Sequence, residues 1–214
     1  NFKFKAGQFV MLHVPKEGEP EGQQEAKPVL RAYSVASDDR QAGNLKLLVK
    51  YVENGIASKY FWQLKSGQEV QITGPFGKVL FKEPPTEQVV FLNTGTGVAQ
   101  HYSYLVSKAD LNPHLRYRML FGVRNESDIY FEPELKEFSQ KLSDFQYEFV
   151  LSRPSEQWKG KKGYVQHFLD ELEIDKRDTT FYLCGNSKMI KEVKHNLIEE
   201  KKFDKSKIHA EAFD

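Results

Sequence analysis

Two glycines stand between a short apolar run and a helix-like segment. The run Val89–Leu92 has the composition of a buried strand, and Gly95 and Gly97 come just before the helix-like segment Val98–Lys108. A helix N-terminus offers free backbone N–H groups, and glycines let a pyrophosphate approach the backbone closely. The segment lacks the third glycine of the dinucleotide fingerprint, because Gln100 stands there. We predict a pyrophosphate-binding loop, with a plain tight turn as the alternative.

A second group of chemically capable residues lies in Arg31–Ser37. Arg31 and Tyr33 fall on one side of a strand, followed by Ser34. A guanidinium binds phosphate in a forked geometry, a tyrosine ring offers a flat stacking face, and a hydroxyl forms hydrogen bonds. On spacing alone, an ordinary strand with an exposed arginine explains the pattern better than a cofactor site does.

A third candidate is the run of Gly55, Ile56, Ala57 and Ser58, which precedes the helix-like segment Lys59–Leu64. A serine near the start of a helix either caps it or helps to bind an anion. The sequence leaves both interpretations open.

Composition excludes several other kinds of site. The net charge of +1 over 214 residues argues for neither nucleic acid nor an anionic membrane as partner, and no apolar run approaches the ~20 residues of a membrane span. Cys184 is the only cysteine, which excludes an intrachain disulfide and an iron–sulfur cluster held by this chain alone. The six histidines show no metal-ligand spacing. This cysteine usage fits a reduced compartment, so we expect a cytoplasmic protein.

The elements that position these residues fall into two groups. Gln8–Val14, Leu45–Val52 and Gln68–Thr73 read as short strands of an antiparallel barrel, with an exposed loop at Lys16–Pro28. Glu83–Thr86 reads as a linker. We therefore predict a β-barrel domain over residues 1–84.

After the linker, strands alternate with helices, which predicts a parallel sheet covered on both faces that binds ligands at the carboxyl ends of its strands. We expect this α/β domain to cover residues 85–214. Its expected strands are Val89–Leu92, Tyr117–Val123, Tyr147–Leu151 and Phe181–Cys184, and its expected helices are Val98–Lys108, Pro133–Leu142, Tyr164–Leu172 and Ser187–Lys201.

Together these motifs resemble the ferredoxin–NADP reductase superfamily over nearly the whole chain. That family joins an antiparallel flavin-binding barrel to a Rossmann-like nicotinamide-binding domain. The resemblance implies that Arg31 binds the flavin pyrophosphate, that Tyr33 packs on the isoalloxazine and that Ser34 lies near its N5. Gly55–Ser58 matches the second flavin-phosphate segment, and Gly74–Gly77 matches the turn that closes the barrel. The start of the chain implies that the family's first barrel strand is missing.

The resemblance also assigns residues to the nicotinamide nucleotide. They are Gly95, Thr96, Gly97, Gly185 and Met189. Cys184 would lie near the nicotinamide ring, with a buried packing residue as the alternative. Gln100 stands where many members of the family have proline, which would alter the phosphate loop slightly.

The spacing of Ser152, Arg153, Lys162 and Tyr164 looks like the pattern of members that use NADPH. Arg153 and Lys162 would pair with the 2′-phosphate, Ser152 would hydrogen-bond it and Tyr164 would stack on adenine. NAD stays possible, because members that use NADH also carry Ser-Arg here. A solvated basic loop at Trp158–Lys162 is the alternative.

By resemblance, Ser34, Cys184 and Glu211 are the polar groups at the reacting centre, and Phe213 is an aromatic that covers the flavin and must swing aside. Glu211 would act through a hydrogen-bond network, with a solvated carboxylate as the alternative.

The predicted activity is hydride transfer from NADPH to noncovalent FAD, followed by one-electron transfer to a ferredoxin, a flavodoxin or a similar redox protein. FMN is the alternative flavin. The alternative functions are an NADH-dependent reductase component of an oxygenase or haem protein, a reductase of free flavin, and a regulatory module without turnover.

Overall fold

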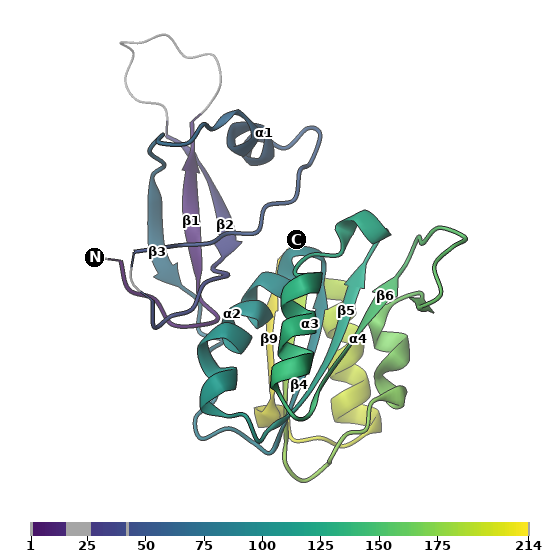
Figure 1. Cartoon of the computed structure of the whole chain (residues 1–214). Coiled ribbons are helices and arrows are strands. Elements are labelled where there is room, and N and C mark those ends of the chain that lie inside the picture. Colours follow the sequence, from purple (N-terminus) through teal and green to yellow (C-terminus); the bar gives the residue numbers. More distant parts are fainter. Residues whose placement is uncertain (1, 16–26, 42, 214) are drawn as a thin grey trace, which may run out of the picture.

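Two β-sheets form the framework of the protein (Figure 1). The computed structural model describes residues 2–15, 27–41 and 43–213, so most of the loop predicted at Lys16–Pro28 lies outside the described residues. None of the helices in the described ranges is long and apolar enough to cross a membrane.

The first sheet is antiparallel and barrel-like, with strand order β2–β1–β3. It comprises β1 (Phe9–Val14), β2 (Val29–Ser34) and β3 (Ile72–Phe76), and helix α1 (Ile56–Gln63) packs on it. Alternate residues of β1 are buried, as the period of two in a strand requires when one face is covered.

The second sheet is parallel, with strand order β7–β6–β5–β4–β8–β9. Its strands are β4 (Gln88–Thr94), β5 (Arg116–Val123), β6 (Phe145–Leu151), β7 (Lys161–Lys162), β8 (Thr179–Gly185) and β9 (Ile208–Ala212). Both faces are covered. Helices α2 (Val98–Lys108) and α3 (Glu132–Lys141) pack on the face of Phe91, and α4 (Ser187–His195) packs on the face of Leu92. These findings confirm the predicted fold class.

One predicted strand is wrong. The segment Leu45–Val52 is not a strand and makes one isolated bridge, through Leu47. The contacts with the second half of the chain come from the residues between the alternating ones: Leu48 packs against the apolar cluster between α2, α3 and the sheet, and Lys50 forms an ion pair with Asp128 at 2.6 Å. Tyr51, one of the alternating residues, is exposed, so the alternation in this segment did not mark a covered face.

Smaller differences concern the limits of elements. Strand β3 runs from Ile72 to Phe76, so it begins and ends later than the predicted Gln68–Thr73 and includes Gly74 and Pro75. The helix expected at Tyr164–Leu172 is a 3-10 helix over Val165–Glu171. The helix expected at Ser187–Lys201 is α4 followed by a π-helical turn at Asn196–Glu200.

Helix α2 lies between the two sheets and is buried almost all round. Nine of its eleven residues are buried. Its polar side chains bind backbone of the first half of the chain: Tyr104 Oη donates to the Val79 carbonyl at 2.6 Å, and Ser103 Oγ donates to the Ser37 carbonyl at 2.8 Å. These bonds fix the two sheets against each other.

His101 of α2 is completely buried. Its ring packs on Phe91, with 4.9 Å between ring centroids, and its Nδ1 lies 3.0 Å from the Asn93 amide nitrogen. Burial lowers the pKa of His101 from 6.5 to about 3, because a charged imidazolium is poorly solvated there.

We predict that this histidine makes the fold sensitive to acid. Between pH 6.5 and about 3 the unfolded chain binds a proton at His101 and the folded chain does not, so the free energy of unfolding falls as the pH decreases. The slope from this residue is about 1.4 kcal/mol per pH unit. The free energy of unfolding, measured with urea at several pH values from 7.5 to 4.5, should fall less steeply with decreasing pH in His101→Phe than in the unchanged protein. We expect that variant to be less stable at pH 7.5.

The exposed His114 provides the matched control. His114→Phe should keep the slope of the unchanged protein, and an equal slope in His101→Phe would contradict the assignment.

Candidate functional site

A cleft of about 400 Å³ lies where the first sheet meets the carboxyl end of the second. Tyr33 and Ser34 line it from β2, Thr96 lines it from the turn after β4, and Glu211 and Phe213 line it from β9 and the residues just after it. These five predicted site residues are 62 to 180 positions apart between the two sheets, and the fold brings them into one cleft.

Of the cleft residues that the sequence interpretation did not assign to the site, those with the largest side chains are Phe9, Leu48 and Lys78. Phe9 packs on Phe76, with 5.9 Å between ring centroids, so it forms part of an apolar wall. Lys78 follows the Gly74–Gly77 turn that the sequence had singled out and is a cation at the edge of the cleft. Its position directly after that turn was the sequence signal that could have identified Lys78 as a cleft residue.

Tyr33 is half-buried and fixed by packing. Its ring meets Phe61 of α1 edge-on, with 5.3 Å between centroids. Burial raises the pKa of Tyr33, while the nearby Arg31 charge lowers it, so the phenol stays neutral at ordinary pH. Arg31 is exposed, and its Nη1 donates to the Leu30 carbonyl at 2.9 Å, which leaves the rest of the guanidinium facing solvent.

Ser58 does not have the position predicted for it. Helix α1 already begins at Ile56, with Gly55 as its N-cap, so Ser58 is inside the helix and does not cap it. The Ser58 hydroxyl is buried, donates to the Val52 carbonyl at 2.8 Å and accepts from the Val52 N–H at 3.1 Å. Any anion at this helix would therefore meet the backbone N–H groups of the first turn, which lack partners within the helix.

The glycine loop after β4 packs against the end of β8. Gly95 has φ +55°, and an added Cβ there would meet no heavy atom within 4 Å. Gly97 is buried, and an added Cβ would lie 2.4 Å from the Cys184 carbonyl oxygen. The strands β4 and β8 are also the place where the chain order reverses, which is where open α/β sheets bind ligands.

Cys184 and Glu211 are neighbours in this region, because β8 and β9 pair them. Cys184 is fully buried, and burial raises the pKa of its thiol well above its usual value. It is therefore a neutral thiol, and its burial suits the packing alternative. Burial also raises the pKa of Glu211, while a hydrogen bond from Gln100 at 3.1 Å lowers it.

The other residues expected near the nucleotide surround α4. Gly185 ends β8, and Met189 is a buried residue of α4. Asn186, which the sequence interpretation missed, caps α4 by accepting from the N–H groups of Lys188 and Met189.

The predicted 2′-phosphate residues gather at the carboxyl ends of β5, β6 and β7. Strand pairing puts Lys162 beside Leu151, directly before Ser152 and Arg153. The Arg153 N–H donates to the Arg124 carbonyl at 2.8 Å, so Arg124 is a further cation that the sequence interpretation missed. Arg153, Lys162 and Arg124 are all exposed. Tyr164 is 58% exposed and can present a ring face.

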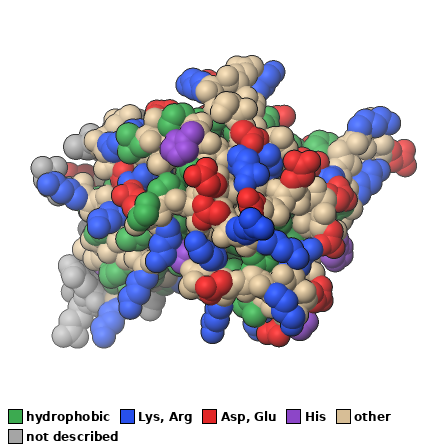
Figure 2. Space-filling model, turned by 90° about the horizontal axis from the view of Figure 1, so that it is seen from below, with side chains coloured by type: hydrophobic (Ala, Val, Ile, Leu, Met, Phe, Trp, Pro, Cys, Tyr) green, Lys and Arg blue, Asp and Glu red, His purple; other side chains and the backbone are tan. Residues whose placement is uncertain are grey.

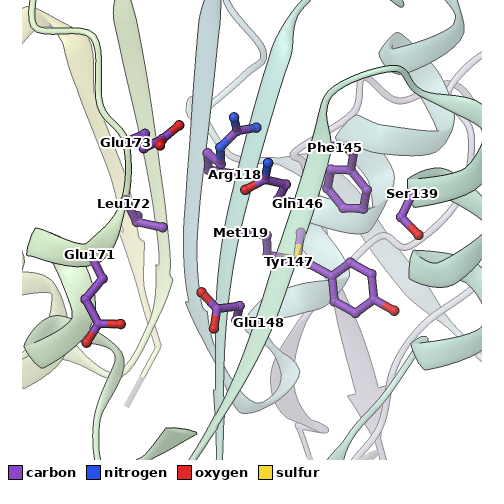
Figure 3. A pocket seen from close by; sticks show the side chains of 10 residues that line it. All are labelled: Arg118, Met119, Ser139, Phe145, Gln146, Tyr147, Glu148, Glu171, Leu172 and Glu173. Carbon is purple, nitrogen blue, oxygen red and sulfur yellow. The ribbon is translucent and has the colours of Figure 1, made fainter. Parts of the chain in front are cut away.

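A second cavity, of about 490 Å³, lies on the first halves of β5 and β6 (Figure 3). Arg118, Gln146 and Glu148 line it, facing Glu171 of the 3-10 helix. It contains none of the predicted site residues and is remote from the carboxyl ends of the strands, so we place the chemistry in the first cleft. In the described ranges, no three His, Cys, Asp or Glu side chains form a metal-binding group.

Comparisons with known proteins agree with this geometry. Residues 1–81 match the family model of an oxidoreductase FAD-binding domain, and residues 91–195 match that of an oxidoreductase NAD-binding domain. Ferredoxin–NADP reductase B of Sorangium cellulosum is 32% identical over 221 residues, covering 100% of this chain and 86% of that protein.

Two further similarities cover a smaller share of the other protein. The anthranilate 1,2-dioxygenase electron transfer component of Acinetobacter baylyi is 27% identical and covers 92% of this chain and 54% of its own length. The crystal structure of the Amycolatopsis cytochrome P450 reductase GcoB has a TM-score of 0.82 at 26% identity, over 99% of this chain and 61% of that one. The chain thus spans less than two thirds of both proteins.

The close contact at Gly97 yields a prediction. Gly97→Ala should lower the free energy of unfolding by about 1–3 kcal/mol, because its methyl group would overlap the Cys184 backbone. Gly95→Asn should change it by less than about 1 kcal/mol, because asparagine tolerates a left-handed conformation and the space there is open. Urea denaturation measures both, and equal losses would show that the contact with β8 does not matter.

Proposed function

Because the chain belongs to the ferredoxin–NADP reductase superfamily of flavin-dependent oxidoreductases, we propose that it takes hydride from NADPH into a bound FAD and delivers electrons singly to a ferredoxin, a flavodoxin or a similar redox protein. The observation that carries the proposal is the shared cleft. Tyr33 and Ser34 approach it from the flavin-binding side, and Thr96 and Glu211 approach it from the nucleotide-binding side.

The lining of the cleft fits a flavin ring. Tyr33, Phe9 and Phe213 provide apolar faces, while Ser34 provides a hydroxyl. In the proposal, Tyr33 packs on the ring, Ser34 lies near N5 and Phe213 covers the ring until the nucleotide displaces it. When bound, FAD supplies the exchange between a two-electron hydride and single electrons.

The rest of the flavin is proposed to follow β2 toward α1. Arg31 has a solvent-facing guanidinium that can fork onto the pyrophosphate. The start of α1, from Gly55 through Ile56 and Ala57 to Ser58, offers backbone N–H groups at the positive end of a helix.

The nucleotide is proposed to lie across the carboxyl ends of the second sheet. Gly95, Thr96 and Gly97 would hold the pyrophosphate, and Gly185 and Met189 would border the nicotinamide. A productive hydride transfer needs the reacting atoms roughly 3–3.5 Å apart, so these residues act by positioning. Cys184 would support the ring from within the sheet.

NADPH is proposed over NADH because Arg153 and Lys162 are exposed cations at adjoining strand ends. Ser152 would add a hydrogen bond, Tyr164 would stack on adenine, and Arg124 would add a third charge. The name of the Sorangium relative supports this choice.

The acceptor has two supported candidates. The Sorangium relative favours a ferredoxin, and the Acinetobacter relative favours a reductase component that serves an oxygenase. Positive and negative side chains are interspersed on the face shown in Figure 2, so that face favours neither an acidic nor a basic partner. A reductase of free flavin is the third possibility.

We predict that the protein purifies with yellow FAD that NADPH bleaches. The bleached protein should then reduce ferredoxin or flavodoxin faster than it reduces free flavin, with all three acceptors tested in parallel. Arg31→Ala should weaken FAD binding by roughly 10- to 100-fold, because it removes a charge-assisted phosphate contact. Arg177→Ala, which changes an exposed arginine of the loop before β8, is the control and should bind FAD normally. A protein that takes up no flavin would overturn the proposal.

The nucleotide prediction is separate. Replacing Arg153 and Lys162 together with alanine should raise the KM for NADPH by roughly 10-fold per residue and leave that for NADH nearly unchanged. Lys159→Ala, an exposed cation of the same loop, should affect neither. Steady-state kinetics with both nucleotides decides, and a preference for NADH in the unchanged protein would refute the assignment.

A further inference from the structure

Gln100 is a buried polar side chain at a junction of three elements. It belongs to the first turn of α2 and has no exposed surface. Its Nε2 donates to the Gly7 carbonyl at 3.0 Å and to Glu211 Oε2 at 3.1 Å. One amide group therefore connects α2, the turn before β1 and strand β9.

The chemistry of the two partners fixes the orientation of this amide. A carbonyl and a carboxylate both accept hydrogen bonds, so only the NH₂ group of Gln100 can face them. Gln100 Oε1 then points away, and it is buried without a hydrogen-bond partner among the described residues. If Glu211 were protonated and the amide rotated to accept its proton, Oε1 would face the Gly7 carbonyl, and two acceptors would repel each other.

The turn at Gly7 cannot move away to relieve such a clash. Gly7 has φ +97°, and an added Cβ would lie 2.4 Å from the Val79 carbonyl oxygen and 2.5 Å from Tyr104 Oη. Tyr104 is one helical turn beyond Gln100 and also bonds Val79. The Gly7 carbonyl thus keeps the NH₂ group of Gln100 turned toward Glu211, and a donated hydrogen bond is stronger to an ionised carboxylate than to a neutral carboxyl.

We propose that Gln100 is a positioning residue that holds Glu211 as an ionised carboxylate at the wall of the cleft. This inference rests on the proposed function, in which Glu211 lines the cleft from the nucleotide-binding side. The nicotinamide ring becomes cationic when its C4 gives up a hydride, so a fixed negative charge beside it stabilises the oxidised nucleotide.

The other titratable groups around Glu211 do not supply a negative charge of their own. Cys184 of β8 and Tyr104 of α2 face it, and burial raises the pKa of both well above their usual values, so both are neutral. His209 lies two residues earlier on β9, and burial lowers its pKa. Lys78 is the cation that lines the same cleft. Among the causes of the pKa of Glu211, burial opposes ionisation and Gln100 favours it.

The test measures Glu211 directly in the FAD-loaded protein. Carboxyl-¹³C glutamate labelling gives a signal for each side chain, and the signal that disappears in Glu211→Gln identifies this residue. Gln100→Met keeps the side-chain length and removes the donor, so the midpoint of the Glu211 titration should rise by about 1–2 pH units. Gln100→Glu, which keeps the shape but replaces the donor with a second acid, should raise it further and serves if Gln100→Met does not fold.

A matched control exists on the other side of the sheet. Gln166 Nε2 donates to Glu192 Oε2 at 2.7 Å, so Gln166→Met removes the same kind of bond and should leave the Glu211 midpoint unchanged. A Glu211 midpoint that does not move in either Gln100 variant overturns the inference. The titration needs no nucleotide, so a shifted midpoint in a protein that fails to oxidise NADPH would instead count against the proposed function alone.

The pH profile of the reduction rate gives a second readout. The inflection that is lost in Glu211→Gln should move to higher pH in Gln100→Met, in step with the NMR midpoint. A purely structural role of Gln100 would lower the rate at every pH without moving the inflection.

Discussion

The arrangement of the molecule depends on a helix that has almost no contact with water. Helix α2 begins at the glycine loop and passes between the two sheets, with nine of its eleven residues buried. A helix covered on one side only could be apolar there and polar elsewhere. Because α2 is covered by two different partners, it packs apolar side chains against the parallel sheet and directs the polar groups of Gln100, Ser103 and Tyr104 to the backbone of the first half. The relative position of the two sheets follows from those few hydrogen bonds.

This constraint explains why a cleft forms where it does. The glycine loop must end close to β8, because Gly97 packs against the Cys184 carbonyl. The first turn of α2 must meet Gly7, just before β1 begins. The residues that line the cleft from β2 and from β9 therefore face each other across a space whose width is set by buried contacts. Positioning of this kind is the main contribution that a protein makes when a cofactor supplies the reactive bonds.

The sequence predicted much of this and missed the rest for identifiable reasons. The parallel sheet was predictable, because its buried strands and amphipathic helices repeat along the chain, and the glycines at 95 and 97 marked its loop. The strand expected at Leu45–Val52 is wrong, because the residue that packs against the distant helices is Leu48, which lies outside the alternating pattern, and a local pattern does not reveal such a contact. The predicted position of Ser58 just before the helix is wrong, because Gly55 is the N-cap of α1 and the helix begins three residues earlier than expected. In the sequence, Gln100 was noted only as a departure from the loop pattern. Its hydrogen bonds were not predictable, because its partners Gly7 and Glu211 lie 93 and 111 positions away.

Strand β9 and the residue after it carry two cleft side chains, Glu211 and Phe213, that are held in different ways. It is an edge strand of the second sheet, paired only with β8 among the described strands. Glu211 is tied to the interior through Gln100, whereas Phe213, two residues later, is held by a backbone hydrogen bond from its N–H to the Gly185 carbonyl at 3.1 Å. The end of an edge strand frays at low energetic cost, and the residues behind it stay ordered. A single residue, Ala212, thus separates a carboxylate tied to the interior from an aromatic side chain that is partly exposed at the strand end.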